Sequence, residues 1–149
     1  MKKICFIFTN GRKARRAAVE KKESPPDFFY GALELQKKGY AVEILEDDDI
    51  PQLGKSRLIA AVIQKLVNLL GIGLDIGLFL RMKNRSFLRR LDDCDAVIAT
   101  TNSYGMTLAI LKTAGKLKSR VIFFSMCPLF PNDGFLKMIV YKKLLKELT

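Results

Sequence analysis

The sequence contains no histidine and no tryptophan, and its three cysteines are far apart. Without histidine, the Ser-His-Asp and Cys-His forms of nucleophilic catalysis are excluded, and so is any metal site that needs an imidazole ligand. Cys5, Cys94 and Cys127 form neither a CxxC pair nor the even, closely spaced set of a disulfide framework. Because Cys5 and Cys127 lie in apolar runs, we expect thiols that pack as small hydrophobic side chains in a reducing compartment.

Long hydrophobic runs are also missing. The apolar run at residues 4–8 is too short for a signal peptide, and a basic loop follows it where a cleavage site would need small residues. Lys65 and Asp75 interrupt the apolar stretch between residues 57 and 80. That stretch therefore falls short of the ~18–20 uncharged residues that span a bilayer. The sequence predicts no transmembrane helix.

Acidic residues are few, since 15 Asp and Glu accompany 26 Lys and Arg and the net charge is +11. The excess is concentrated in two blocks. Residues 51–90 contain eight basic residues and one acidic residue, Asp75, and residues 112–149 contain eight basic and two acidic residues. Such blocks suit an anionic membrane surface or nucleic acid. Because no nucleic-acid-binding motif accompanies them, we expect no nucleic-acid partner.

What the sequence does contain is a regular alternation of strand and helix patterns within 149 residues, the size of one domain. The first strand is apolar on both faces, as in the middle of a sheet that helices cover on both sides. The alternation predicts a single α/β domain with a doubly wound, mostly parallel, Rossmann-like sheet in a three-layer α/β/α arrangement. The predicted strands lie at residues 2–8, 40–46, 95–101 and 120–126. The predicted helices begin at 24–27 and end at 37–39, and lie at 57–70, 104–114 and 135–148, with a helical turn or two at 14–22.

Ligands of such folds bind at the carboxyl ends of the strands, which singles out the loops at residues 9–12, 100–105 and 125–131. The GxGxxG and Walker A motifs are absent, which argues against NAD, FAD and P-loop nucleotides. The polar residues at 100–105 suit a sugar hydroxyl, a phosphate or FMN, while capping of the next helix by Asn102 or Ser103 is the simpler interpretation. The basic residues of the first loop suit a phosphate or solvent. The acidic run at 46–49 is interpreted as a solvated loop, with a metal site as the less favoured alternative.

The helix predicted at residues 57–70 is very apolar. Its polar positions, Arg57, Gln64, Lys65 and Asn68, form one narrow stripe at helical spacing. The favoured interpretation is a helix that covers the sheet. The alternative is a helix that binds a membrane surface together with the basic cluster that follows it.

Several segments resemble the GT-B glycosyltransferases, in particular their family 4-like N-terminal domain. The segment at residues 29–45 carries most of the likeness, because it is similar to the family's passage from a helix through a glycine, here Gly39, into the second strand. The other similar segments are residues 3–8, 91–99, 120–125 and 141–143. The resemblance implies that residues 1–149 are the acceptor-side domain of an enzyme that moves a sugar from a nucleotide-sugar donor to a glycan or lipid-linked acceptor.

The resemblance also implies a C-terminal domain that holds the donor. In this family a pair of glutamates eight residues apart contributes to donor binding, and no such pair occurs in this sequence. We therefore expect the chain to need a separate donor domain and to be inactive alone. We expect a location in the cytoplasm, at the inner face of a membrane, and neither a cofactor nor a bound metal. Two alternatives stay open, a non-catalytic membrane-surface module and a flavodoxin-like FMN-binding protein.

Three groups of residues are the candidate sites under this interpretation. The predicted phosphate side consists of Asn10, Gly11 and Arg12. The predicted acceptor side consists of Asn102, Ser103 and Tyr104. The basic residues expected to face an anionic membrane are Arg81, Lys83, Arg85, Arg89 and Arg90.

Overall fold

Strand β1 (Lys3–Ile7) lies inside a four-stranded parallel sheet with the strand order β2-β1-β3-β4. The other strands are β2 (Ala41–Leu45), β3 (Ala96–Ala99) and β4 (Arg120–Phe123). Ile7 near the end of β1 is in register with Leu45 of β2 on one side and with Ala99 of β3 on the other. The computed structural model describes residues 1–25, 29–54, 57–69, 74–124, 139 and 142–143. This strand order confirms the predicted doubly wound, parallel, Rossmann-like sheet.

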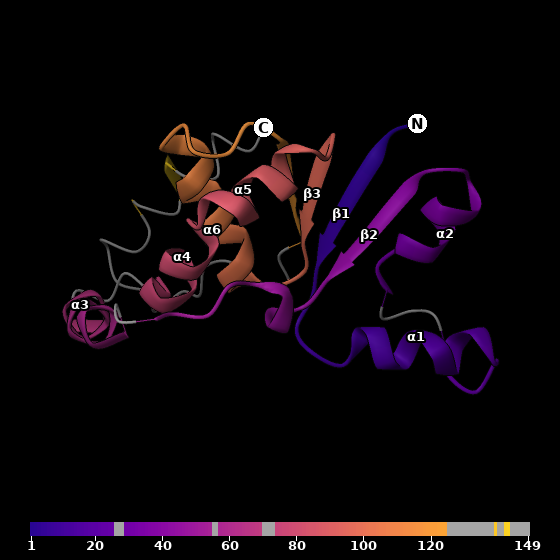
Figure 1. The fold of residues 1–149 in the computed structure, drawn as a ribbon, viewed down its shortest axis with the longest axis horizontal. Coiled ribbons are helices and arrows are strands. Elements are labelled where there is room, and N and C mark those ends of the chain that lie inside the picture. Colours follow the sequence, from indigo (N-terminus) through magenta and orange to yellow (C-terminus); the bar gives the residue numbers. More distant parts are fainter. Residues whose placement is uncertain (26–28, 55–56, 70–73, 125–138, 140–141, 144–149) are drawn as a thin grey trace.

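Helices cover both faces of the sheet and complete the predicted three layers (Figure 1). On one face, Cys5 and Ile7 of β1 pack with α4 (Ile76–Met82), α5 (Arg85–Asp92) and α6 (Asn102–Thr113). On the other face, Phe6 and Phe8 pack against Phe29 and the helices α1 (Arg12–Glu20) and α2 (Ala32–Lys37). Successive β1 side chains thus alternate between two apolar clusters, which is why the strand is apolar on both faces.

The second helix begins later than predicted. Tyr30 and Gly31 have positive φ angles of 49° and 84°, and α2 starts only after them, at Ala32. Backbone in this left-handed region does not continue a right-handed helix, which explains the later start. Ser24, at the predicted start of this helix, accepts a hydrogen bond of 3.1 Å from Nε of Arg15. The helical turn or two predicted at 14–22 form the nine-residue helix α1.

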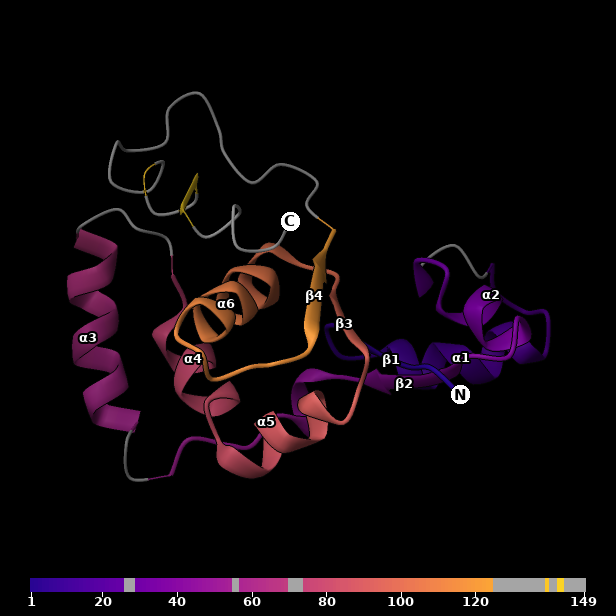
Figure 2. The same cartoon turned by 90° about the horizontal axis from the view of Figure 1, so that it is seen from above.

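Helix α3 (Arg57–Leu69) agrees with the prediction at 57–70. It contacts α4 and lies at the margin of the molecule, away from the sheet, as Figure 2 shows. None of the described helices has the length and apolar character needed to cross a membrane.

Some predicted features lie outside the described residues. These are the loop at 125–131, most of the predicted helix at 135–148, and Cys127. The other two cysteines, Cys5 and Cys94, are buried free thiols.

Candidate functional site

A polar crevice of about 370 Å³ opens at the carboxyl ends of β1, β2 and β3. We call it the strand-end crevice, and its lining residues are Thr9, Asp47, Asp75, Leu78, Arg81, Thr101, Ser103 and Tyr104. Strands β2 and β3 lie on opposite sides of β1, so the crevice sits where the chain reverses its direction of winding. This is the position at which doubly wound sheets bind their ligands.

The ends of β1 and β3 are tied together beneath this crevice. Both the backbone N–H and the hydroxyl of Thr100 donate to the Ile7 carbonyl, at 3.3 and 2.8 Å. On the other side of β1, the Phe8 N–H donates to the Leu45 carbonyl at 2.8 Å. The loops that follow these strands therefore leave the sheet side by side, which brings Thr9, Asp47 and Thr101 to one opening.

Arg81 of α4 lines the crevice and binds the segment that follows β2. Its Nη1 lies 3.0 Å from each carboxylate oxygen of Asp47, and its Nη2 donates to the Asp47 and Ile50 carbonyls at 2.7 and 3.2 Å. Its Nε donates to the Pro51 carbonyl at 3.1 Å, and the side chain is only 14% exposed. The planar guanidinium group suits such a convergent set of acceptors. The prediction that Arg81 faces a membrane is therefore wrong, because its charge is turned inward onto Asp47.

Tyr104 lines the crevice and contacts the same carboxylate as Arg81. Its hydroxyl lies 3.3 Å from Oδ1 of Asp47 and donates to it. Burial, together with the neighbouring Asp47 carboxylate, raises the pKa of Tyr104 to about 12. The phenol therefore stays protonated at neutral pH and acts as a hydrogen-bond donor.

The acidic run at residues 46–49 is a structural element and not the solvated loop that the sequence suggested. Asp47–Asp49 form a short 3-10 helix, η2, and Glu46 and Asp49 cap each other's backbone N–H groups. The buried Glu46 carboxylate also accepts from the Lys13 N–H, and the Lys13 ammonium binds Asp49. The run thus fastens the start of α1 to the end of β2. Within the described residues, no group of three or more side chains is arranged to hold a metal.

The predicted phosphate side lies beside the crevice and does not line it. The Asn10 side-chain amide donates to the Asp48 carboxylate at 3.0 Å, and its amide oxygen accepts from the Asp48 backbone N–H at 3.2 Å. Gly11 precedes α1 with a φ angle of 98°, a conformation that favours glycine, and Arg12 is the first residue of the helix. A phosphate-binding role for Asn10, Gly11 and Arg12 stays a prediction.

The predicted acceptor side agrees better with the observed geometry. Ser103 and Tyr104 line the crevice, while Asn102, the first residue of α6, does not. The helix is capped by neither Asn102 nor Ser103, because the Thr101 hydroxyl accepts from the Tyr104 N–H at 3.4 Å. Asp47 and Asp75 are lining residues that sequence reasoning missed, although Asp47 directly follows a predicted strand.

The remaining basic residues of the predicted membrane cluster lie on the surface. Lys83, Arg85, Arg89 and Arg90 are exposed. Arg90 binds the Glu43 carboxylate of β2 at 2.6 Å, so part of its charge is neutralised within the chain. A membrane role for Lys83, Arg85 and Arg89 stays a prediction.

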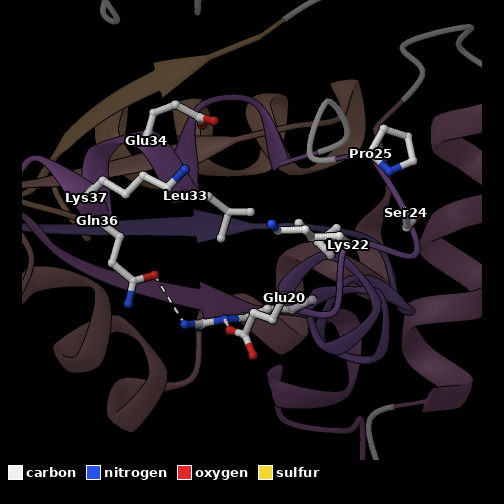
Figure 3. A pocket seen from close by; sticks show the side chains of 10 residues that line it. Glu20, Lys22, Ser24, Pro25, Leu33, Glu34, Gln36 and Lys37 are labelled. Carbon is white, nitrogen blue, oxygen red and sulfur yellow. Dashed lines mark hydrogen bonds and ion pairs between the residues drawn. The ribbon is translucent and has the colours of Figure 1, made fainter.

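A second, larger pocket of about 720 Å³ lies between α1 and α2 (Figure 3). Val19, Pro25 and Leu33 supply apolar lining, and the surrounding charged side chains have both signs. Arg16 on its rim binds Glu20 at 2.9 Å and Gln36 at 3.2 Å, the second contact being drawn in Figure 3. The pocket shares no lining residue with the strand-end crevice. Its size alone does not make it the better candidate, because most of its polar lining residues are exposed and it lies away from the carboxyl ends of the strands.

The fold and the crevice define a doubly wound α/β domain with a crevice lined by polar residues at its topological switch point. Comparisons of the chain with protein-family models, with curated proteins and with solved structures give no match. The function must therefore be argued from the residues of the site.

Proposed function

We propose that this chain is the acceptor-binding half of a glycosyltransferase that moves a sugar from a nucleotide-sugar donor to a glycan or lipid-linked acceptor. The observation that supports this most is the lining of the strand-end crevice. It brings together the hydroxyl groups of Thr9, Thr101 and Ser103 with the Asp47 carboxylate and the Tyr104 phenol. Hydroxyl and carboxylate groups converging on a small opening suit a ligand that is itself rich in hydroxyl groups.

Asp47 is the group that would orient the acceptor. Its carboxylate is held by Arg81 and Tyr104, and its side chain is still 36% exposed. The exposed part can accept a hydrogen bond from an acceptor hydroxyl, while the contacts with Arg81 and Tyr104 prevent the carboxylate from turning away. In the transfer, that hydroxyl oxygen forms a bond to the anomeric carbon of the donor sugar and releases its proton to solvent, while the bond to the diphosphate breaks and the nucleoside diphosphate leaves. The crevice contributes position and orientation to this step.

Binding of sugars to the crevice can be tested on the ¹⁵N-labelled full chain by NMR. We expect N-acetylglucosamine or methyl glucoside to shift the amide signals of residues 9, 47 and 101–104. The double variant Thr9→Val/Ser103→Ala removes two lining hydroxyl groups and should weaken binding at least about fivefold, since each lost hydrogen bond contributes about 1 kcal/mol.

Ser86→Ala is the matched control, because Ser86 also lies in the first turn of a helix, α5, but outside the crevice. It should bind as the unmodified chain does. Shifts confined to other regions, or equal binding by both variants, would contradict the proposal. Tight binding of FMN by the purified chain would favour the flavodoxin-like alternative instead.

A further inference from the structure

Helix α3 is attached to the rest of the molecule through its polar side. The Gln64 amide nitrogen donates to the Leu74 carbonyl at 2.8 Å, and its amide oxygen accepts from the Ile76 N–H at 2.7 Å. These two backbone groups belong to the segment that leads into α4. Ala60 is the one buried residue of α3. The side of the helix that faces the molecule thus carries Gln64, the small Ala60 and the half-buried Val67, whereas most of its large apolar side chains lie elsewhere.

The large apolar side chains of α3 point away from the molecule. We call this surface the α3 outer face and define it by five residues with their exposed fractions: Leu58 (80%), Ile59 (62%), Val62 (63%), Leu66 (57%) and Leu69 (85%). At about 100° per residue, these positions span only about 100° of the helix circumference. An apolar stripe of this width normally faces a core, and its exposure marks an interaction surface.

The charges on α3 indicate which partner fits. Arg57 and Lys65 are exposed on the helix, and residues 51–74 contain no Asp or Glu. Lys65 lies at the border of the outer face, about 20° around the helix from Leu58. A second copy of this chain packed on the outer face would bring Lys65 of both copies into one interface, which is unfavourable. An anionic lipid surface accepts both the apolar stripe and the bordering Lys65, whose long side chain can reach the headgroups.

We propose that α3 is an interfacial helix, which lies in the plane of an anionic bilayer with the α3 outer face in contact with the acyl chains. With 13 residues the helix is about 20 Å long, so it fits along a surface and is too short to span the bilayer. Its place at the margin of the molecule leaves the outer face accessible (Figure 2). This inference does not rest on the proposed function. If both hold, α4 connects them, because it contacts α3 and contributes Leu78 and Arg81 to the strand-end crevice.

The test is co-sedimentation of the full chain with vesicles of phosphatidylcholine mixed with phosphatidylglycerol. We expect the unmodified chain to bind these vesicles, to bind pure phosphatidylcholine less, and to be released in part by salt. The triple variant Leu58→Ser/Val62→Ser/Leu69→Ser keeps the net charge and should lower the partition coefficient at least about tenfold. Circular dichroism shows whether each variant is folded. If the triple variant is not, the single variant Leu69→Ser carries the test, since Leu69 is 85% exposed.

Two matched controls separate the outer face from general effects. Ile122→Ser also removes an exposed apolar side chain, on β4, and should bind as the unmodified chain does. Lys65→Gln should weaken binding more than Lys118→Gln, which removes the same charge at an exposed position elsewhere. No binding of the unmodified chain to anionic vesicles at low salt would overturn the proposal. Undiminished vesicle binding by a folded triple variant would also overturn it, and a dimer that this variant converts to a monomer would identify a second copy as the occupant.

Discussion

Helices α3 and α4 follow each other in the most basic stretch of the chain, yet they use their polar and apolar residues in opposite ways. In α4, the cation Arg81 is turned inward and only 14% of its side chain is exposed. In α3, Leu58 and Leu69 are turned outward and are 80% and 85% exposed. The difference lies in the partners. Arg81 meets a carboxylate and three backbone carbonyls, whereas the side of α3 that faces the molecule meets two backbone groups that hydrogen-bond to Gln64. Hydrophobicity alone does not decide which face of a helix is buried when polar groups of the neighbouring backbone need partners.

We expect the largest loss of stability when the buried cation Arg81 is removed. Arg81→Met should lower the free energy of unfolding by about 3 kcal/mol, because Asp47 loses its counter-charge and three carbonyls lose a donor. Urea denaturation followed by circular dichroism measures the change. Arg85→Met, at an exposed arginine of α5, should change the unfolding free energy by less than about 0.5 kcal/mol. Equal effects of the two substitutions would show that Arg81 does not hold the crevice together.

Packing around glycine also differs between α6, which packs closely against β4, and α4. A Cβ atom added at Gly105 of α6 would lie 2.2 Å from Cδ2 of Phe123, whereas one at Gly77 of α4 would lie 3.7 Å from Leu53 and 3.3 Å from Asp75. Gly105→Ala should therefore cost about 2 kcal/mol through overpacking. Gly77→Ala should stay within about 1 kcal/mol of the unmodified chain, because its contacts are looser and alanine favours the helix. Thermal unfolding of both variants tests this, and a larger loss for Gly77→Ala would contradict it.

The sequence predicted the parts of the fold that depend on local pattern. The β1 strand was recognisable because successive positions such as Cys5 and Phe6 are both apolar, and the predicted doubly wound fold then indicated the loops at the carboxyl ends as the candidate site. The direction of Arg81 was not predictable, because its partner Asp47 lies 34 residues earlier and the two meet only in the folded chain. The start of α2 was placed too early, at 24–27, because residues 24–27 (Ser-Pro-Pro-Asp) are typical of a helix start, whereas the helix begins only after Gly31. The orientation of α3 depends on Gln64 contacting the backbone at residues 74 and 76, and no periodicity in the sequence reports such a contact.

A smaller effect is expected when the attachment of α3 is loosened. Gln64→Ala leaves the Leu74 carbonyl and the Ile76 N–H without their side-chain partner and should weaken the attachment by about 1 kcal/mol. Amide hydrogen exchange within residues 57–69 should then speed up roughly fivefold, with little change in β1. Lys65→Ala is the control, since Lys65 is exposed on the same turn. Unchanged exchange in Gln64→Ala would mean that other contacts orient the helix.

The smallest expected effect is a loss of folding stability at acidic pH. Burial by itself would raise the pKa of Glu43, but hydrogen bonds from Lys3 and Arg90 outweigh it and hold the pKa below its ordinary value. A carboxylate of this kind stabilises the fold above the pKa it has in the unfolded chain, and the contribution is lost as the pH falls through the lower pKa of the folded state. We expect the free energy of unfolding to fall by less than about 1 kcal/mol from about pH 5 downward. In Glu43→Gln the free energy of unfolding should depend less on pH over this range. Urea midpoints across this pH range measure it, and equal slopes for both proteins would contradict the assignment to Glu43.

The central claim is the proposal that the α3 outer face contacts the acyl chains of an anionic membrane. Because the chain has no tryptophan, a single introduced tryptophan reports on one position only. Val62→Trp places the reporter on the α3 outer face, and Arg89→Trp places it at an exposed position of α5. With vesicles that contain phosphatidylglycerol, we predict a blue shift of the emission and quenching by brominated acyl chains for Val62→Trp, and neither change for Arg89→Trp. A shift and quenching at position 89 with no change at position 62 would contradict the account.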